Sequence, residues 1–512
     1  MPKLVLLWFS AGFLAGIIAA AQFSFSPPWF LLILPLILLL FGIFDHRSPL
    51  FKVFPFIALL LFFFWTGTQA YSHKVHSSLQ PIYDIDTSQS NLVIKGLVIE
   101  PTLDSSGSSE TVLELQAYQG ADGVWHSAHA KVNVRLPEVF DFPYHATLTL
   151  QGQLIPSVDD TINPHTSWLL RDGIHFEMFY PQVIAEAAPQ DKSLIGILFG
   201  LRSTCHAVLQ SIMPFPESEL LSGILLGIES RIPDYLVDAY RVTGTAHIIA
   251  ISGFNITLIA NLISKFFNRI FPYRVGALLS ILAVGIYTLF VGAQPAVLRA
   301  AIMGIIAIPA YLLGRKVISF HALALTAAVM AALNPFILWD VSFQLSFCAT
   351  FGILMFTDYF AQYGRILLEK SCLPSPEVLY KFLRDYLFTT LAAQLATFPV
   401  MVIYFDGFSI FSPLVNMFIL PLQPVIMVMG GAALLIGLFF FPLGQILGLL
   451  TWFVAALNDQ IVLLFSQFSI SLFINKTWGF WISVSLNLLL LILTFRCRKN
   501  HETPEDQFSS TI

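Results

Sequence analysis

The sequence predicts an all-α polytopic membrane bundle with a small β-domain inserted near the N-terminus. Of the 512 residues, 56% are hydrophobic and only 11% are charged, whereas soluble domains average about 25% charged residues. Apolar runs long enough to cross a bilayer recur along the chain. Between residues 71 and 190 they give way to short β-like runs separated by turn residues.

Three apolar runs open the chain and predict membrane helices over residues 4–21, 29–44 and 53–68. Only Lys3 precedes the first run, and two further runs follow it closely. We therefore interpret the first run as a retained helix rather than a signal peptide. These helices make up the N-terminal transmembrane domain, residues 1–70.

The β-domain is predicted over residues 71–190. Its five β-like runs span residues 92–100, 111–118, 124–136, 146–154 and 174–183. Five short strands in about 120 residues suit a small OB-like barrel. A sandwich fragment or an unrelated β-fold is the alternative.

Residues 191–242 are more polar than a spanning segment. Leu194–Met213 is amphipathic and Glu217–Val242 is rich in charge. Both are expected to be interfacial or re-entrant elements on the outer side of the membrane.

Nine further spanning helices are predicted in a channel-type domain, residues 243–495, followed by a tail, residues 496–512. They cover residues 245–264, 275–293, 295–313, 317–333, 340–356, 387–405, 413–438, 443–466 and 478–495. With the first three, the total is about twelve. Lys and Arg cluster in alternate loops, which by the positive-inside rule places both termini in the cytoplasm and the β-domain outside the cell membrane.

The segment 243–260 carries the most informative polar residues: His247, Ser252, Gly253 and Asn255. Polar side chains at membrane depth are costly and mark functional sites. Glycines allow a helix to break, which is tolerated where the backbone lines a cavity or is buried in protein. A pore lining, a helix interface and an intramembrane enzyme all remain open. On a continuous helix, however, His247 and Ser252 would point about 140° apart.

Arg299 lies in an otherwise apolar run and is expected to face the bundle interior or a watery path. Its nearness to the outer end of that run leaves snorkelling as the alternative. Gln344, Ser346, Gln394 and Asn416 are further polar residues in apolar surroundings. They are candidates for pore lining, with interhelical hydrogen bonding as the alternative.

The β-domain contains 14 Asp and Glu residues against five Lys and Arg residues. Single-strand binding normally uses a basic groove with stacking aromatic rings. Lys131, Arg135 and Trp125 are the candidate DNA contacts. The aromatic residues of the domain could instead fill its core.

Motifs for enzymatic chemistry are missing from the printed sequence. It contains no P-loop, no GxSxG, no HExxH and no zinc-type cysteine spacing,. We therefore expect no catalytic residues, no metal and no cofactor.

Five motifs occur in one order: GTAHIIAISGFNITLIA at 244–260, PAVLRAAIM at 295–303, NPFILWDVSFQLSFCATFGI at 334–353, AQLATFPV at 393–400 and LVNMFILPL at 414–422. This series resembles the membrane competence domain of the ComEC family of DNA-uptake proteins. The stretch NPHTSWLLRDGIHFE at 163–177 is similar to the family's N-terminal OB-type domain.

The resemblance implies that single-stranded DNA crosses the cytoplasmic membrane through this protein during natural transformation. His247, Ser252, Gly253, Arg299, Gln344 and Ser346 match family-typical positions, whereas Asn255 stands where the family usually has His. Many members carry a metallo-β-lactamase-like nuclease domain with an HxHxDH motif, which is not found here. The expected partners are DNA, lipids, a separate cytoplasmic helicase or ATPase motor and a separate nuclease; homo-oligomerisation is left open. The alternative function is a small-molecule or lipid transporter on the same fold.

Overall fold

The computed structural model describes residues 5–23, 54–85, 91–158 with short gaps, 165–187, 194–312, 319–369, 376–405, 408–468 and 476–501, with a few isolated positions. The predicted helix 29–44 and the tail beyond residue 501 lie outside these residues. The chain divides into two compact units. Unit 1 holds Met1–Thr204 and Ala324–Asp340, and unit 2 holds Cys205–Leu323 and Val341–Ile512.

In unit 1, helices α1 (Val5–Phe23) and α3 (Phe54–Tyr83) pack against each other along small residues. A Cβ atom at Gly16 would overlap the carbonyl of Phe64, and one at Gly67 would overlap that of Phe13. Close approach through glycine is the usual way for apolar helices to associate in lipid, because dispersion contacts must replace the hydrophobic effect.

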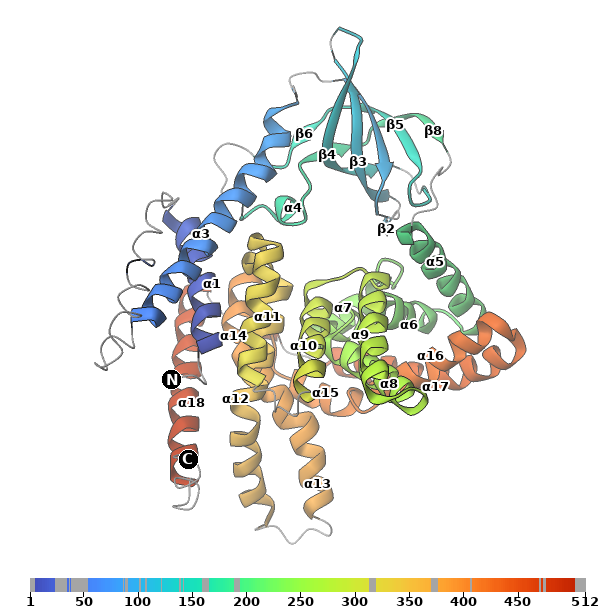
Figure 1. The fold of residues 1–512 in the computed structure, drawn as a ribbon. Helices are drawn as coiled ribbons and strands as arrows, with labels where there is room; N and C mark the ends of the chain where they lie inside the picture. The colour runs from blue at the N-terminus through green and yellow to red at the C-terminus, as the bar shows by residue number, and fades with distance from the viewer. Residues whose placement is uncertain are drawn as a thin grey trace. The chain divides into compact units, whose positions relative to one another are not determined.

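The β-domain is an eight-stranded sheet in the order β6-β7-β4-β3-β1-β5-β8, with β2 paired to β3 (Figure 1). The strands are β1 (Leu92–Val98), β2 (Leu103–Ser105), β3 (Ser108–Gln119), β4 (Trp125–Leu136), β5 (Thr147–Gly152), β6 (Ile155–Pro156), β7 (Phe176–Phe179) and β8 (Gln182–Ala187). The β4–β7 pair is parallel and the other pairs are antiparallel. The order β5-β1-β3-β4 is that of a Greek key.

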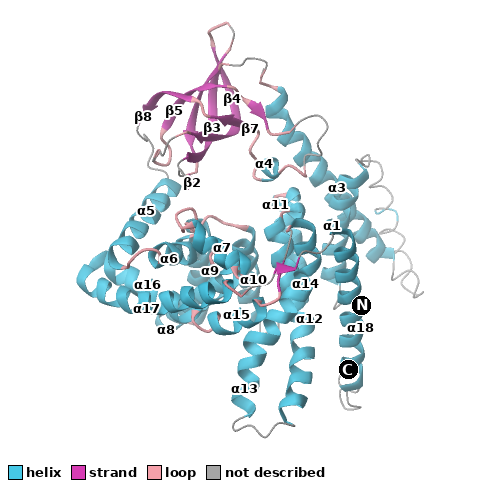
Figure 2. Ribbon diagram, turned by 180° about the vertical axis from the view of Figure 1, so that it is seen from behind, coloured by secondary structure: helices cyan, strands magenta, loops and turns pink. Residues whose placement is uncertain are grey.

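Alternation of apolar residues builds the core of this sheet. In β4 the even positions Val132, Val134 and Leu136 are fully buried, while the odd positions face the other side,. Short helix α4 (Trp168–Arg171) precedes β7 and is capped by the Ser167 hydroxyl. Figure 2 shows the strands of this sheet gathered in one domain.

The predicted β-run 174–183 is wrong as a single strand. It forms β7, which is next to one end of the strand order, and β8, which is at the other end. Tyr180 has φ 52° and Pro181 lacks a backbone N–H, so the chain turns there and cannot continue one ladder.

Unit 2 is helical. Its elements are α6 (Glu217–Leu226), α7 (Asp234–Val242), 3₁₀ turn η3 (Ala246–Ile248), α8 (Gly253–Ile270), α9 (Tyr273–Phe290), α10 (Pro295–Leu312), α12 (Val341–Glu369), α13 (Pro376–Phe382), π-helical η5 (Leu383–Phe388), α14 (Thr389–Tyr404), β9 (Phe408–Ser409), α15 (Ser412–Ile419), α16 (Gln423–Phe439), α17 (Phe441–Ser466), β10 (Ser471–Leu472) and α18 (Lys476–His501). Helix α5 (Leu194–Ile212) begins in unit 1 and ends in unit 2, whereas α11 (Ser319–Leu333) begins in unit 2 and ends in unit 1. The 3₁₀ turn η4 (Pro335–Trp339) belongs to unit 1.

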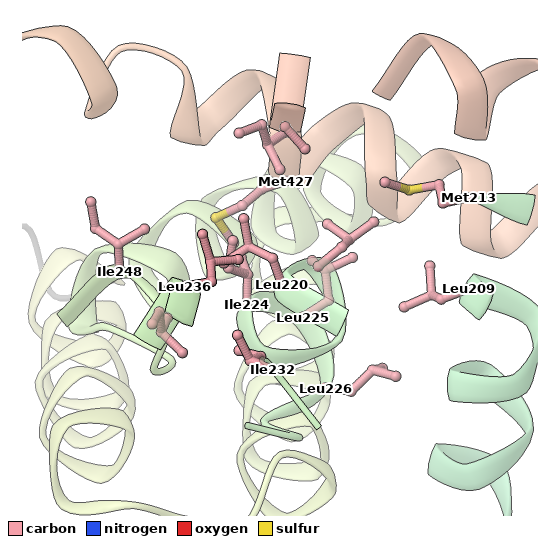
Figure 3. Packing of buried hydrophobic residues seen from close by; sticks show 14 of the residues in the cluster. Leu209, Met213, Leu220, Ile224, Leu225, Leu226, Ile232, Leu236, Ile248 and Met427 are labelled. Carbon is pink, nitrogen blue, oxygen red and sulfur yellow. The ribbon is translucent and has the colours of Figure 1, made fainter. Parts of the chain in front are cut away.

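Its main core joins the C-terminal half of α5 with α6, α7, η3, α15, α16 and α17. Figure 3 shows Leu220 and Ile224 of α6 packed among Leu236, Ile248 and Met427. Every residue of α6 is buried. The segment 217–242, expected at the interface, therefore supplies part of the core.

Among the described residues, eight helical segments are long and apolar enough to cross a membrane, and nine if the bent pair α15 and α16 is one span. Helix α5, expected to lie at the interface, is one of the eight. The run predicted as one helix over 413–438 is bent by 44° between α15 and α16. Pro421 and Pro424 lie at the bend, where the missing N–H groups interrupt the helical ladder. The expected total of about twelve spans stays a prediction.

Candidate functional site

The segment between α7 and α8 is not a continuous helix. Gly244 follows α7 with φ +72°, η3 makes one short turn, and α8 begins only at Gly253. The predicted break is therefore present, although the predicted helix 245–264 starts eight residues later than expected. The break brings the N-terminus of α8 inside unit 2.

Ser252 caps that N-terminus. Its hydroxyl accepts a hydrogen bond from the Asn255 backbone N–H at 3.3 Å and donates to Asn255 Oδ1 at 3.0 Å. Such caps stabilise a helix by about 1 kcal/mol. Asn255 is 3% exposed and its Nδ2 has no hydrogen-bond partner. The amide thus leaves a buried donor unused within the first turn of α8.

Arg299 approaches the same helix end from α10, which packs on α8 and on α12. Its Nε donates to Ser346 Oγ of α12 at 2.6 Å, and its Nη1 lies 3.9 Å from the Met303 sulfur. A Cβ atom on Gly253 would overlap Nη2 of Arg299. Position 253 is therefore glycine because the guanidinium rests directly on its Cα.

This arrangement concentrates positive potential. The N-terminus of a helix carries about half a positive charge and several unpaired N–H groups. Arg299 adds a full charge, and among the described residues it forms no ion pair. A guanidinium and a helix N-terminus that meet without an acid form an anion-binding arrangement.

A second set of polar side chains, from Ser412, Asn416 and Gln394, lies at the break near Gly244. The Ser412 hydroxyl donates to the Gly244 carbonyl at 3.1 Å, and Asn416 Nδ2 donates to the Ser412 oxygen at 3.4 Å. Gln394 of α14 donates to the Ser409 carbonyl at 3.2 Å. These bonds hold irregular backbone inside the protein, as a low-dielectric surrounding requires.

The other predicted positions have different surroundings. His247 is exposed on η3 and forms no hydrogen bond within the described chain, so no Ser252–His247 pair is formed there. Gln344 is half-buried on α12, two residues before Ser346. The structure therefore groups Ser252, Gly253, Asn255, Arg299 and Ser346, joins Gln394 and Asn416 to the break, and leaves His247 apart.

In the β-domain, Lys131 and Arg135 share the face of β4 that is turned away from the core. Arg135 lies 3.6 Å from Glu110 and its guanidinium stacks over the Phe179 ring at 5.6 Å. Glu114 lies opposite Lys131 in the β3–β4 ladder. This face has mixed charge rather than forming a basic strip.

The aromatic rings of the domain divide between core and surface. Phe176 is fully buried, whereas Trp125 is 46% exposed and Tyr180 is 61% exposed. Trp125 is therefore accessible for stacking at the first residue of β4.

A cluster that the sequence did not predict lies within unit 1. Tyr71 Oη and His165 Nδ1 are 2.7 Å apart, and the His165 ring stacks 4.4 Å from Trp339. Arg171 Nη1 donates to the Trp339 carbonyl, and Asn334 Nδ2 donates to the Arg171 carbonyl at 3.0 Å. The motif at 163–177 thus packs on the NPFILW motif at 334–339, and no pattern in either motif indicates the other as its partner.

Two further groups of hydrogen-bonded side chains that the sequence did not predict lie in unit 2. The Tyr240 hydroxyl donates to Asp459 Oδ1 at 2.7 Å and accepts from Asn458 Nδ2 at 2.6 Å. Glu219 accepts from His206 at 2.9 Å and from Gln210 at 2.8 Å. In the sequence, Asp459 alone indicates this site, because it is an acidic residue inside a predicted spanning helix.

The apolar helices indicate a helical membrane protein. The irregular segment before α8 and Arg299 beside the start of α8 give it an internal polar site. The family model described as Competence protein matches residues 224–500, which include the whole group around Arg299. This chain belongs to the Competence protein family, as the ordered motifs predicted.

Two curated proteins illustrate the similarity. ComE operon protein 3 of Bacillus subtilis (strain 168) is 24% identical over 443 residues, which cover 84% of this chain and 51% of that protein. Uncharacterized protein YcaI of Escherichia coli (strain K12) is 24% identical over 241 residues, which cover 44% of this chain and 30% of that protein. The chain spans about half the length or less of these relatives. No solved structure matches it.

Proposed function

We propose that this protein is a channel component that passes single-stranded DNA across the cytoplasmic membrane during natural transformation. The observation that carries the proposal is Arg299, a cation without an acidic partner among the described residues, held against the N-terminus of α8. Family membership and the similarity to a protein named for a competence operon support the same role.

The chemistry of the site suits a phosphodiester. A strand of DNA presents one negative charge per nucleotide, and proteins hold it through Arg, helix N-termini and backbone N–H groups. Arg299 offers Nη2, and Asn255 offers a buried unpaired Nδ2 in the same helical turn. Because neither group selects a base, the site would read the backbone of any sequence.

The topology belongs to the same proposal. With both termini in the cytoplasm, the β-domain lies outside the membrane and meets the strand first. Its Greek-key strand order, with a fifth strand parallel to β4, supports the OB-like assignment,. Trp125 is an accessible stacking residue. Lys131 and Arg135 lie beside Glu114 and Glu110, which weaken their attraction for DNA.

Two further activities, a motor and a nuclease, are not assigned to this chain. Strand passage needs a motor on the cytoplasmic side and a nuclease for the other strand, which we assign to separate proteins. The chain itself is proposed to be non-enzymatic. Purified protein incubated with labelled DNA and Mg²⁺ or Mn²⁺ should leave the strands intact, and metal-dependent cleavage would contradict this.

The direct test is Arg299→Gln in the transformable host. A charge-assisted contact is worth about 1.5–3 kcal/mol, so loss of one obligatory phosphate contact should lower transformation by at least about tenfold. Binding of DNA to the cell surface should be unchanged. The matched control is Arg241→Gln, which removes an exposed arginine paired to Asp238 and should transform normally.

The same anion-binding centre could take a lipid phosphate instead. Normal transformation by Arg299→Gln, together with altered lipid composition or export, would replace DNA by lipid as the substrate. Normal transformation without any lipid phenotype would overturn the assignment of Arg299 as an anion site.

A further inference from the structure

We propose that Asp459, Tyr240 and Asn458 form a proton-binding site inside the membrane domain, with Asp459 as the group that takes up and releases the proton. The site is separate from Arg299 and its neighbours and uses residues of α7 and α17. It concerns the binding of a proton rather than of DNA, so it does not depend on the substrate assigned above.

The three side chains meet at one oxygen. The Tyr240 hydroxyl donates to Asp459 Oδ1 and accepts from Asn458 Nδ2. Tyr240 and Asn458 are fully buried, and Asp459 is 3% exposed. The hydroxyl therefore both donates and accepts, and the bond from Asn458 fixes the direction of its proton towards Asp459.

The carboxylate of Asp459 and the amide of Asn458 each have one oxygen without a hydrogen-bond donor in the described part of the chain. Asp459 Oδ2 and Asn458 Oδ1 are buried and have no hydrogen-bond partner within the described residues. An ionised carboxylate with a single neutral donor in a low-dielectric interior is strongly disfavoured. Binding a proton at Oδ2 neutralises Asp459 and supplies an O–H donor, whereas release leaves a charge that the surroundings must stabilise.

The surrounding helices contribute no cation to Asp459. Helices α15 and α16 pack on α17 and contain no ionisable side chain. The ionisable groups on the other neighbouring helices are Cys205, His206 and Arg202 of α5, Glu217 and Glu219 of α6, and Asp234, Tyr235, Asp238, Tyr240 and Arg241 of α7.

Four of these groups pair with one another. Arg241 pairs with Asp238 on the surface, and His206 pairs with Glu219. Glu217 is 9% exposed and accepts from Trp452 Nε1 at 3.1 Å. A second buried acid nearby further disfavours ionisation of Asp459.

Glu219 provides an internal comparison. It is as deeply buried as Asp459, at 3% exposure, but both of its carboxylate oxygens receive donors. Although burial alone would raise the pKa of Glu219, the hydrogen bonds from His206 and Gln210 lower it. Two acids in one core thus differ in protonation because their donors differ.

The test is infrared spectroscopy of the full-length protein in lipid bilayers while the pH is varied. Wild type should show the carbonyl band of a buried protonated carboxylic acid at neutral pH, and this band should disappear as the pH is raised. Asp459→Asn should lose the titrating band. Glu219→Gln, the matched control, should keep it.

Asp459→Glu keeps the carboxyl group and should show a shifted band, which guards against misfolding of the amide variant. Absence of a protonated-acid band in wild type, or its persistence in correctly folded Asp459→Asn, would overturn the proposal. So would a carboxylate signal that responds to Na⁺ at constant pH, because that would indicate a metal-ion site. Since the band reports the proton directly, these outcomes are independent of whether Arg299→Gln affects transformation.

Discussion

Gly253→Ala tests the packing of Arg299 against α8. Alanine is the better helix former by about 0.5–1 kcal/mol, so local propensity alone predicts that the change stabilises the protein. The structure predicts the reverse, because the added Cβ would overlap Arg299 Nη2. Relief requires the guanidinium to move from its bond to Ser346.

The magnitude follows from these two terms. Loss of a hydrogen bond from a charged donor costs about 1.5–3 kcal/mol. Subtracting the helix gain leaves a net destabilisation of roughly 0.5–2.5 kcal/mol. Because the displaced group is the proposed phosphate contact, transformation should fall by at least about tenfold, as for Arg299→Gln.

Thermal unfolding of the purified protein and transformation frequency are the two assays. The control is Gly285→Ala on α9, where an added Cβ meets no atom within 4 Å, and it should leave both unchanged or slightly raise stability. Combining Gly253→Ala with Arg299→Gln should be markedly less than additive, because the second change removes the atom that clashes. Wild-type behaviour of Gly253→Ala, or full additivity of the pair, would refute the reasoning.

Three further predictions concern the β-domain, the topology and the break. Burial, and next the charges of Lys74 and Lys131, lower the pKa of His175 to about 4. Protonation of His175 therefore opposes folding, and the β-domain should keep its full free energy of unfolding above pH 6.5. Between pH 6.5 and 4 this free energy should fall by at most about 3 kcal/mol, or by roughly 1–2 kcal/mol once solvent screening is included. Hydrogen exchange of β4 and β7 amides would measure this, and a pH-independent rate of opening would contradict it. In intact cells an impermeant thiol reagent should label Ser127→Cys in the exposed β3–β4 hairpin but not the native Cys372, and the opposite pattern would reverse the proposed sidedness. Gly244→Ala should destabilise unit 2 by about 1–2 kcal/mol in thermal unfolding, because φ is +72° and the new Cβ would press on Ser412,; an unchanged midpoint would show that the break relaxes freely.

Local chemistry made the break predictable. Glycines at 244 and 253 and the Ser252–Asn255 spacing are short-range signals, and the structure uses them as a left-handed turn, a helix start and an N-cap. The single-strand interpretation of 174–183 failed at Tyr180 and Pro181. Hydrophobic pattern predicts that residues are buried in a sheet, but it does not say which end of the sheet they join.

The sequence by itself determined that this is an apolar helical protein with a β-domain, that a polar break follows residue 243, and which family it belongs to. These properties depend on composition, periodicity and motif order, all of which are local. The tertiary structure decided that Arg299 rests on Gly253 and bonds Ser346, and that Tyr240 meets Asp459 across 219 positions of the chain. Such contacts depend on how helices pack, because a buried charge gains or loses its partners only when distant segments come together.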